Sequence, residues 1–151
     1  MTHPHREPNS NLLLKTLAEF RYELRRFMHF SESIALDAGL QPQQHQLLLQ
    51  IAGARDGAPV TIAYAAERLG LKHNSTVELV DRSEREGLLT RTADPSDKRR
   101  AILEMSNKGR SLLDRLASDH ADELKDRAPR LIEALEHVRS HAAIDAGAEA
   151  R

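Results

Sequence analysis

The sequence lacks cysteine and tryptophan altogether, and it contains only three phenylalanines and two tyrosines among 151 residues. The absence of cysteine excludes disulfides, thiolate catalysis, cysteine-based redox sensing and cysteine-ligated zinc. With so few aromatic residues, the core has to consist mainly of leucine, isoleucine, valine and alanine. Such a composition at helical spacing predicts a mainly α-helical protein, and the length fits one domain.

Long hydrophobic runs are missing as well. No stretch approaches the ~18 apolar residues of a membrane-spanning helix. The first ten residues are polar and have none of the apolar character of a signal peptide. We therefore expect a cytoplasmic protein without a membrane partner.

The chain has little net charge, formally −1, so it is not a polycation as a whole. The charges are nevertheless unevenly distributed. Residues 68–110 hold ten Lys/Arg against seven Asp/Glu, a difference of +3, whereas residues 111–151 hold six against nine, a difference of −3. A basic segment is typical of a nucleic-acid-binding region, although an excess of this size is weak evidence by itself.

Apolar residues at spacings of three and four predict a helix over about residues 11–36 and a second from Pro42 to Ala52. We expect residues 1–10 to form a flexible arm. Thr61 is placed to cap a short helix that ends at Leu69, and Gly70 suits a sharp left-handed turn. A further helix is predicted from Asn74 to Glu86.

Two β-like runs come next, over residues 88–92 and 100–105, and the segment between them has the composition of a turn. Ser106 can cap a long final helical region, which Pro129 is expected to break or restart. Residues 145–151 are expected to form a flexible tail. The order predicts a winged helix-turn-helix over about residues 42–105, followed by helix.

The most specific motif is Asp94-Pro95-Ser96-Asp97-Lys98-Arg99, followed at a fixed spacing by Met105-Ser106-Asn107-Lys108-Gly109. It resembles the wing signature of the MarR family of bacterial transcription regulators, Asp-x-Arg and then Leu-Thr-x-x-Gly. The resemblance extends over roughly residues 11–141. Two positions depart from it: Glu78 stands where many members have arginine or another DNA-contacting residue, and Ser83 stands where leucine is usual.

A winged helix-turn-helix binds duplex DNA with one helix in the major groove and its hairpin tip at the minor groove or the phosphates. The resemblance implies that Arg99 reaches the minor groove and that Asp97 holds the hairpin. The expected DNA-binding residues are Asn74, Ser75, Thr76, Glu78, Arg82 and Arg85 on the helix, and Asp97, Lys98, Arg99 and Arg100 on the wing. The alternative is a solvated turn and an exposed helix face, with Ser75 or Thr76 serving only as a cap.

The terminal helices have more apolar residues than so thin a protomer can bury. The resemblance implies a homodimer formed by helices over about residues 11–36 and 106–144, and hence a pseudo-palindromic operator in double-stranded DNA. The expected dimer-interface residues are Leu12, Leu13, Leu17, Leu131, Ile132, Leu135 and Val138.

The family resemblance also implies a pocket for a small effector, often an anionic aromatic compound, that releases the protein from its operator. The candidate effector-binding residues are Tyr22, Arg25, Arg26, His29, Gln44 and His45. The same side chains are also compatible with a purely structural role in holding the helices together.

Other kinds of site have little support. His137 and His141 are spaced to share a metal on a helix, but no neighbouring cluster completes a site, so no metal or cofactor is expected. No nucleophile–base pair or glycine-rich phosphate loop indicates an enzyme. Besides a ligand-responsive repressor, two alternatives stay open: an effector-independent or architectural DNA-binding protein, and a winged helix that binds a protein partner.

Overall fold

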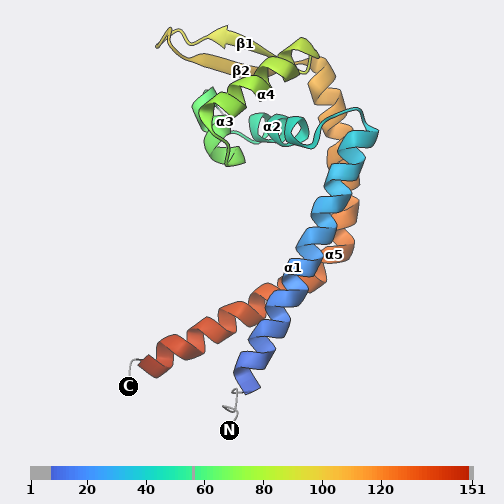
Figure 1. Cartoon of the computed structure of the whole chain (residues 1–151), viewed down its shortest axis with the longest axis vertical. Helices are drawn as coiled ribbons and strands as arrows, with labels where there is room; N and C mark the ends of the chain where they lie inside the picture. The colour runs from blue at the N-terminus through green and yellow to red at the C-terminus, as the bar shows by residue number, and fades with distance from the viewer. Residues whose placement is uncertain (1–7, 56, 150–151) are drawn as a thin grey trace. The chain divides into compact units, whose positions relative to one another are not determined.

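The structure, a computed structural model, describes residues 8–55 and 57–149 (Figure 1). Its elements, in chain order, are α1 (Pro8–Asp37), α2 (Pro42–Ala52), α3 (Ile62–Leu69), α4 (His73–Arg85), β1 (Leu89–Ala93), β2 (Ala101–Met105) and α5 (Asn107–Glu149). The predicted mainly α fold with a small hairpin is thereby confirmed. Compact packing divides the chain into two units, residues 31–119 and the described residues before and after them.

The ends of the chain differ from the prediction. α5 continues through Pro129 as far as Glu149, so a break at the proline is wrong, and the helix includes residues 145–149 of the expected flexible tail. A proline removes one backbone donor, and a long helix absorbs its ring by bending locally. At the other end α1 begins at Pro8, inside the expected arm, whose first seven residues lie outside the described part of the chain.

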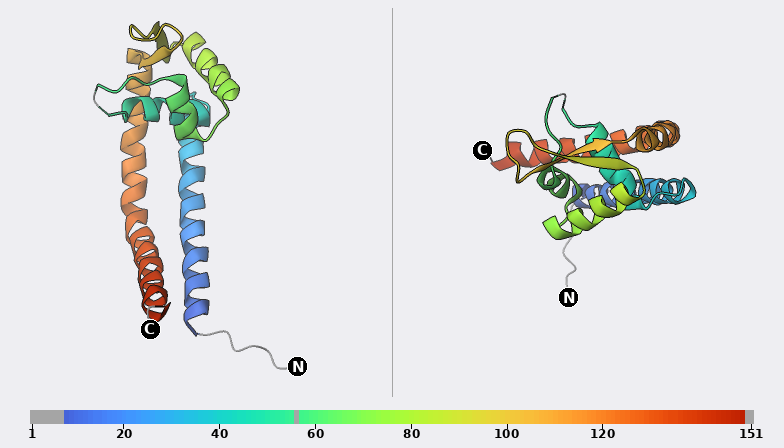
Figure 2. Two further views of the ribbon diagram at one scale, coloured as in Figure 1. Left: turned by 90° about the vertical axis from the view of Figure 1, so that its left-hand side faces the viewer. Right: turned by 90° about the horizontal axis from the view of Figure 1, so that it is seen from above.

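The unit of residues 31–119 is built around two apolar clusters. The first joins α2, α3, α4 and the hairpin through Leu47, Val60, Ala65, Leu79, Val80, Leu89 and Leu103. The second joins the end of α1, α2 and the start of α5 through Ala35, Leu40, Leu48, Leu88, Leu113 and Leu116. As the sequence predicts, these cores contain aliphatic side chains, and they hold α4 and the hairpin on one scaffold (Figure 2).

The hairpin is antiparallel, with Leu89 opposite Met105 at its base and Ala93 opposite Ala101 toward its tip. The Leu103 N–H donates to the Val60 carbonyl at 2.8 Å, which ties the outer edge of β2 to the segment before α3. The base of the hairpin is therefore fixed to the core, whereas its tip extends beyond it.

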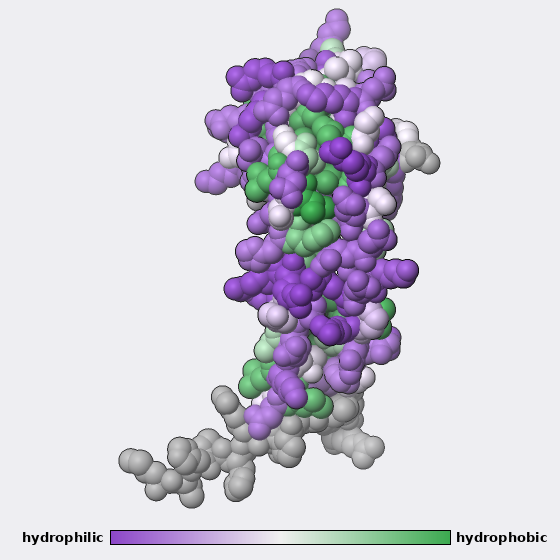
Figure 3. All heavy atoms as spheres, turned by 90° about the vertical axis from the view of Figure 1, so that its right-hand side faces the viewer, coloured by the Kyte–Doolittle hydropathy of each residue, from purple (hydrophilic) through white to green (hydrophobic). Residues whose placement is uncertain are grey.

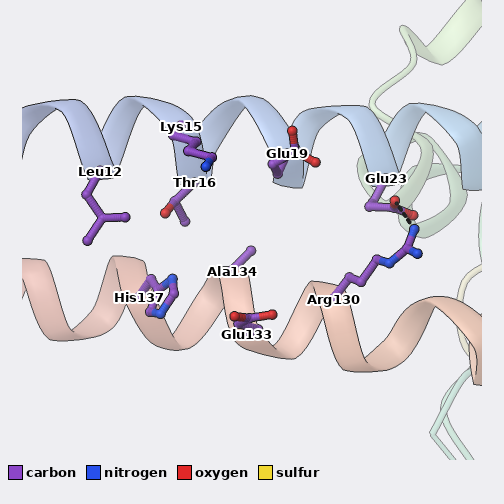
Figure 4. Close-up of a pocket in the computed structure, with 9 residues that line it drawn as sticks. All are labelled: Leu12, Lys15, Thr16, Glu19, Glu23, Arg130, Glu133, Ala134 and His137. Carbon is purple, nitrogen blue, oxygen red and sulfur yellow. Dashed lines mark hydrogen bonds and ion pairs between the residues drawn. The ribbon is translucent and has the colours of Figure 1, made fainter.

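The second unit consists of the first part of α1 and the later part of α5, which lie side by side and antiparallel (Figures 2 and 4). Glu23 is buried here and accepts from Arg127 at 2.9 Å and from Arg130 at 3.1 Å. The rings of Phe27 and Phe30 each meet His120 edge-on, with centroids 5.8 Å apart. A buried carboxylate needs such partners, because an unpaired charge away from water is very costly.

Candidate nucleic-acid interface

Local capping sets the direction of α3 and the turn into α4. The Thr61 hydroxyl accepts the Tyr64 N–H at 3.2 Å, which satisfies a donor at the start of α3. Gly70 has φ 64°, the left-handed conformation that glycine adopts without strain, and its N–H bonds back to the end of α3. Both predictions are confirmed, and together they create the tight turn between the two helices.

α4 has one buried face and one exposed face. Thr76, Leu79, Val80 and Ser83 are buried against the core. The exposed residues include five of the predicted DNA-binding set, Asn74, Ser75, Glu78, Arg82 and Arg85. Asn74, Glu78, Arg82 and Arg85 recur at helical spacing and form one stripe, so the structure brings most of the predicted residues of this helix together.

Thr76 departs from this pattern. Its side chain is fully buried, and its hydroxyl donates to the Lys72 carbonyl at 3.0 Å. The structure therefore places it on the buried face of α4, away from the exposed residues predicted to bind DNA. Ser83, where the family usually has leucine, is also buried and donates to the Leu79 carbonyl at 2.8 Å, so its polar group is satisfied inside the helix.

The hairpin tip is organised by two aspartates. Buried Asp94 accepts from the Ser96 N–H at 2.9 Å and from the Ser96 hydroxyl at 2.6 Å, and its other oxygen pairs with Arg100 at 2.8 Å. Asp97 accepts from the Arg99 backbone at 3.0 Å and from its Nε at 3.1 Å. These are turn-type bonds that fold a short loop without help from the core.

Both aspartates are held in the charged form. The hydrogen bonds from Ser96, with the charge of Arg100, lower the pKa of Asp94 below its ordinary value of 3.8. The hydrogen bonds from Arg99 do the same for the pKa of Asp97. The sequence indicated Asp97 as the residue that holds the hairpin but missed the equally important Asp94. The signal was present, since an aspartate two residues before a serine is typical of such a turn.

The tip presents three consecutive cations, Lys98, Arg99 and Arg100, all exposed. The Arg99 side chain is 90% exposed despite its bonds to Asp97, whereas Arg100 is half exposed and is used to hold Asp94. Lys98 and Arg99 are therefore available to an anionic partner. Arg100 is tied to the loop that it belongs to.

A further arginine, missed by the sequence analysis, joins the hairpin to α4. Arg91 of β1 contacts Asp81 and Glu84, both at 2.8 Å from its Nη2, and its backbone N–H donates to Glu84 at 3.1 Å. The hydrogen bonds from Arg91 lower the pKa of Glu84, and Glu84 in turn raises the pKa of Arg91. No spacing rule in the sequence links a strand residue to these two positions.

Residues 38–100 match the model of the MarR family, and these residues run from just after the end of α1 through the hairpin tip. Over this part of its length the chain is similar to the MarR family. Members of this family are transcription regulators and not enzymes. No protein with a curated description matches the chain in sequence.

Several solved structures share the fold. The transcriptional repressor CouR bound to a 23-mer DNA duplex is 26% identical, with a TM-score of 0.61 over 87% of this chain and 89% of that chain. CouR from Rhodococcus jostii RHA1 bound to p-coumaroyl-CoA is 21% identical, with a TM-score of 0.58 over 75% and 83%. The S. aureus MepR–DNA complex is 20% identical, with a TM-score of 0.64 over 85% and 94%.

The predicted effector residues of this chain fall into two groups. Tyr22, Arg25, Arg26 and His29 are exposed on α1 in the terminal unit, with the Arg26 guanidinium 5.6 Å from the Tyr22 ring centroid. Gln44 and His45 are buried in α2 of the other unit. The Gln44 amide accepts from the Gln41 N–H and donates to Glu86 at 2.8 Å, so its polar groups are already used within the protein.

A cavity of about 360 Å³ lies between α1 and α5 in the terminal unit (Figure 4). Lys15 and Arg130 bring positive charge to it, and Glu19, Glu23 and Glu133 bring negative charge. Of the residues predicted for the effector or the dimer interface, only Leu12 lines it. The cavity is thus distinct from the effector site that the sequence suggested.

The predicted dimer residues are largely uncovered within the protomer. Leu12, Leu17, Ile132 and Leu135 are between 40% and 54% exposed, and Leu13, Leu131 and Val138 are partly buried. Hydrophobic residues reach the surface among hydrophilic ones in the face that Figure 3 shows. Exposed leucines at this density mark a surface that gains free energy when another chain covers it.

Within residues 8–55 and 57–149, no group of histidine and acidic side chains is placed to hold a metal ion, and no helix is long and apolar enough to cross a membrane.

Proposed function

We propose that this chain is a homodimeric repressor of the MarR family that binds a pseudo-palindromic operator through α4 and the hairpin tip. The observation that carries the proposal is the pairing, within one unit, of the exposed α4 stripe with the exposed cations of the tip. A polar helix face suits base edges in the major groove. An extended arginine suits the electronegative minor groove.

The similarity to CouR bound to a 23-mer duplex supports a repressor that binds DNA. On this proposal Asn74 and Ser75 bind phosphate or bases at the start of α4, and Arg82 and Arg85 bind farther along. Glu78 takes the position of a base-reading residue and favours cytosine, whose N4 amino group donates to a carboxylate. Lys98 and Arg99 bind at the minor groove or the phosphates.

Self-association follows from the terminal helices. The exposed side chains of Leu12, Leu17, Ile132 and Leu135 form the apolar part of the proposed dimer interface. Two copies related by a two-fold axis would present two α4 helices to half-sites about one helical turn apart.

The proposal includes a small effector that binds α1 of the terminal unit. CouR has been solved with p-coumaroyl-CoA bound, and the exposed aromatic and cationic residues Tyr22, Arg25, Arg26 and His29 suit an anionic aromatic compound. Such a compound releases DNA only if it binds unequally to the DNA-competent and incompetent forms.

One observation favours the alternative, an effector-independent or architectural DNA-binding protein. Gln44 and His45 are buried, and the Gln44 amide is occupied, so two of the six proposed effector residues are unavailable without rearrangement. A panel of anionic aromatic compounds added to the protein–operator complex separates the two. Release by any member supports the effector, and retention with all of them supports the alternative.

The first test is fluorescence anisotropy with the chain's own upstream intergenic DNA, across a salt series, for wild type and Arg99→Ala. We expect tight, salt-sensitive binding that the mutation weakens, with the slope of log affinity against log salt reduced by about one if a phosphate contact is lost. Arg115→Ala, an exposed arginine of α5, serves as the matched control. Equal affinity and slope for wild type and Arg99→Ala would remove the wing from the interface.

A further inference from the structure

The hairpin is joined to α4 by a polar side chain of β1 as well as by the apolar core. Leu89 is the last buried residue of β1, and Thr92 and Ala93 beyond it are exposed. Arg91 lies between them, half buried, and its side chain turns back to α4. It is therefore a polar link between β1 and α4, at the level of Leu103, the buried core residue opposite it on β2.

This link has several contacts rather than one. The Arg91 guanidinium donates to Glu84 Oε2 through Nε at 3.1 Å and through Nη2 at 2.8 Å, and Nη2 also pairs with Asp81 at 2.8 Å. The Arg91 backbone N–H bonds the other Glu84 oxygen at 3.1 Å. Two acceptors on α4 thus fix both the position and the plane of the guanidinium, which a single point contact cannot do.

The link also affects the charge beside the proposed DNA surface. Asp81 and Glu84 precede Arg82 and Arg85 in the chain, so two carboxylates lie next to the exposed stripe of α4. Unpaired carboxylates there would repel phosphates. Arg91 pairs with both of them, so the charged side chains left on the exposed stripe are Glu78, Arg82 and Arg85.

We propose that Arg91 is a positioning residue for DNA binding, which sets the angle of the wing against α4 so that both reach the duplex together. The inference rests on the proposed DNA-binding function. Arg91 is level with Leu103, and Arg99 is four residues from Leu103, so the Arg99 tip lies about 13 Å along the hairpin from Arg91 at about 3.3 Å per residue. A tilt of about 10° at Arg91 then moves the tip by about 2 Å, more than a hydrogen bond tolerates.

A double-mutant cycle tests this coupling. Arg91→Lys keeps the positive charge but cannot make the forked contact, and it is combined with Arg99→Ala in operator-binding measurements. In the wild-type background we expect Arg99→Ala to weaken binding about tenfold, and in the Arg91→Lys background less than about threefold. Equal losses in both backgrounds would show that Arg91 does not position the wing, even if it contributes to stability.

The control is Arg115→Lys, the same change at an exposed arginine of α5, which should leave the effect of Arg99→Ala unchanged. If Arg91→Lys does not fold, Glu84→Gln takes the place of Arg91→Lys in the cycle, because it removes the charge at the other end of the link. Failure of the wild type to bind any DNA selected from random sequence would count against the proposed function and not against the link itself.

A second measurement needs no DNA. Because the chain has no cysteine, spin labels can be attached at Glu78→Cys and Lys98→Cys without removing native thiols. In labelled protein diluted with unlabelled protein, we expect one narrow α4-to-tip distance distribution, which Arg91→Lys broadens. Distributions of the same width for both proteins would overturn the proposal whatever the DNA result.

Discussion

At the scale of single residues, the chemistry of the hairpin depends on aspartates whose charge the fold stabilises. Asp94 is the more revealing of the two because it is buried and yet bonded to Ser96 and Arg100. A carboxylate with three donors around it favours the ionised form. The hydrogen-bonded structure of the hairpin tip should therefore depend on pH.

The direction of that dependence follows from the lowered pKa of Asp94, which the bonds from Ser96 hold below the ordinary 3.8. A lowered pKa means that the stabilisation is present above pH 3.8 and is lost as the pH falls through the folded-state pKa. In an NMR titration, the Ser96 amide should keep its folded shift down to pH 3.8 and change only below it. Asp94→Asn should abolish the step, and a midpoint above 3.8 would contradict the assignment.

Gly109, part of the MarR-like motif, has a packing role that the structure makes specific. A Cβ at this position would collide with the Leu88 carbonyl oxygen and approach Met105 Cγ at 3.0 Å. Gly109→Ala should therefore lower the free energy of unfolding by about 1–3 kcal/mol, as overpacking usually does. Urea unfolding measures this, with Ser111→Ala, at an exposed site of the same helix, expected within about 0.5 kcal/mol of wild type.

At the scale of elements, the C-terminal end of α4 is bonded to α2 and to the start of α5. Gln44 donates to the Glu86 side chain, Lys108 donates to the Glu86 carbonyl, and Ser106 donates to the Gly87 carbonyl. These contacts leave the helix little freedom to move independently of α2 and the start of α5. An event that shifts α2 or α5 would thus be transmitted to α4.

α5 is the element with the clearest local conflict, because Pro129 lies inside it. Proline lacks the backbone N–H that would bond to residue 125 and costs about 3 kcal/mol relative to alanine inside a helix. Pro129→Ala should raise the free energy of unfolding by up to about 3 kcal/mol and increase the helical circular dichroism signal. A destabilised variant would contradict this and mean that Pro129 contributes to packing.

At the scale of the whole molecule, the exposed apolar side chains of the terminal helices are the basis of the proposed dimer. Leu135 is 54% exposed in the protomer, so a charge there costs little until a partner covers it. Leu135→Glu should shift the protein from dimer to monomer in analytical ultracentrifugation at micromolar concentration, with the fold retained. Leu49→Glu is the matched control, because Leu49 is 42% exposed but lies on α2, outside the proposed interface. A Leu135→Glu protein that stays fully dimeric would refute the role of Leu135 in the interface.

The sequence by itself determined the features that depend on neighbours along the chain. The Thr61 cap, the left-handed Gly70, the hairpin turn and the Ser106 cap of α5 were all predictable, because each is a bond within a few residues. The exposed stripe of α4 followed from helical periodicity. These local rules, with the MarR resemblance, were enough for the fold and for most of the candidate DNA-binding residues.

Tertiary structure alone decided what depends on residues distant in the chain or on degrees of burial. Ser75 and Thr76 look alike in sequence, yet only Thr76 faces the core. Arg91 of β1 pairs with Asp81 and Glu84 of α4, and Glu23 pairs with Arg127 and Arg130 within the terminal unit. Gln44 donates to Glu86 instead of lining an open pocket. The physical reason is that side-chain periodicity fixes which face a residue occupies on its own element, while its partners are fixed by how the elements pack.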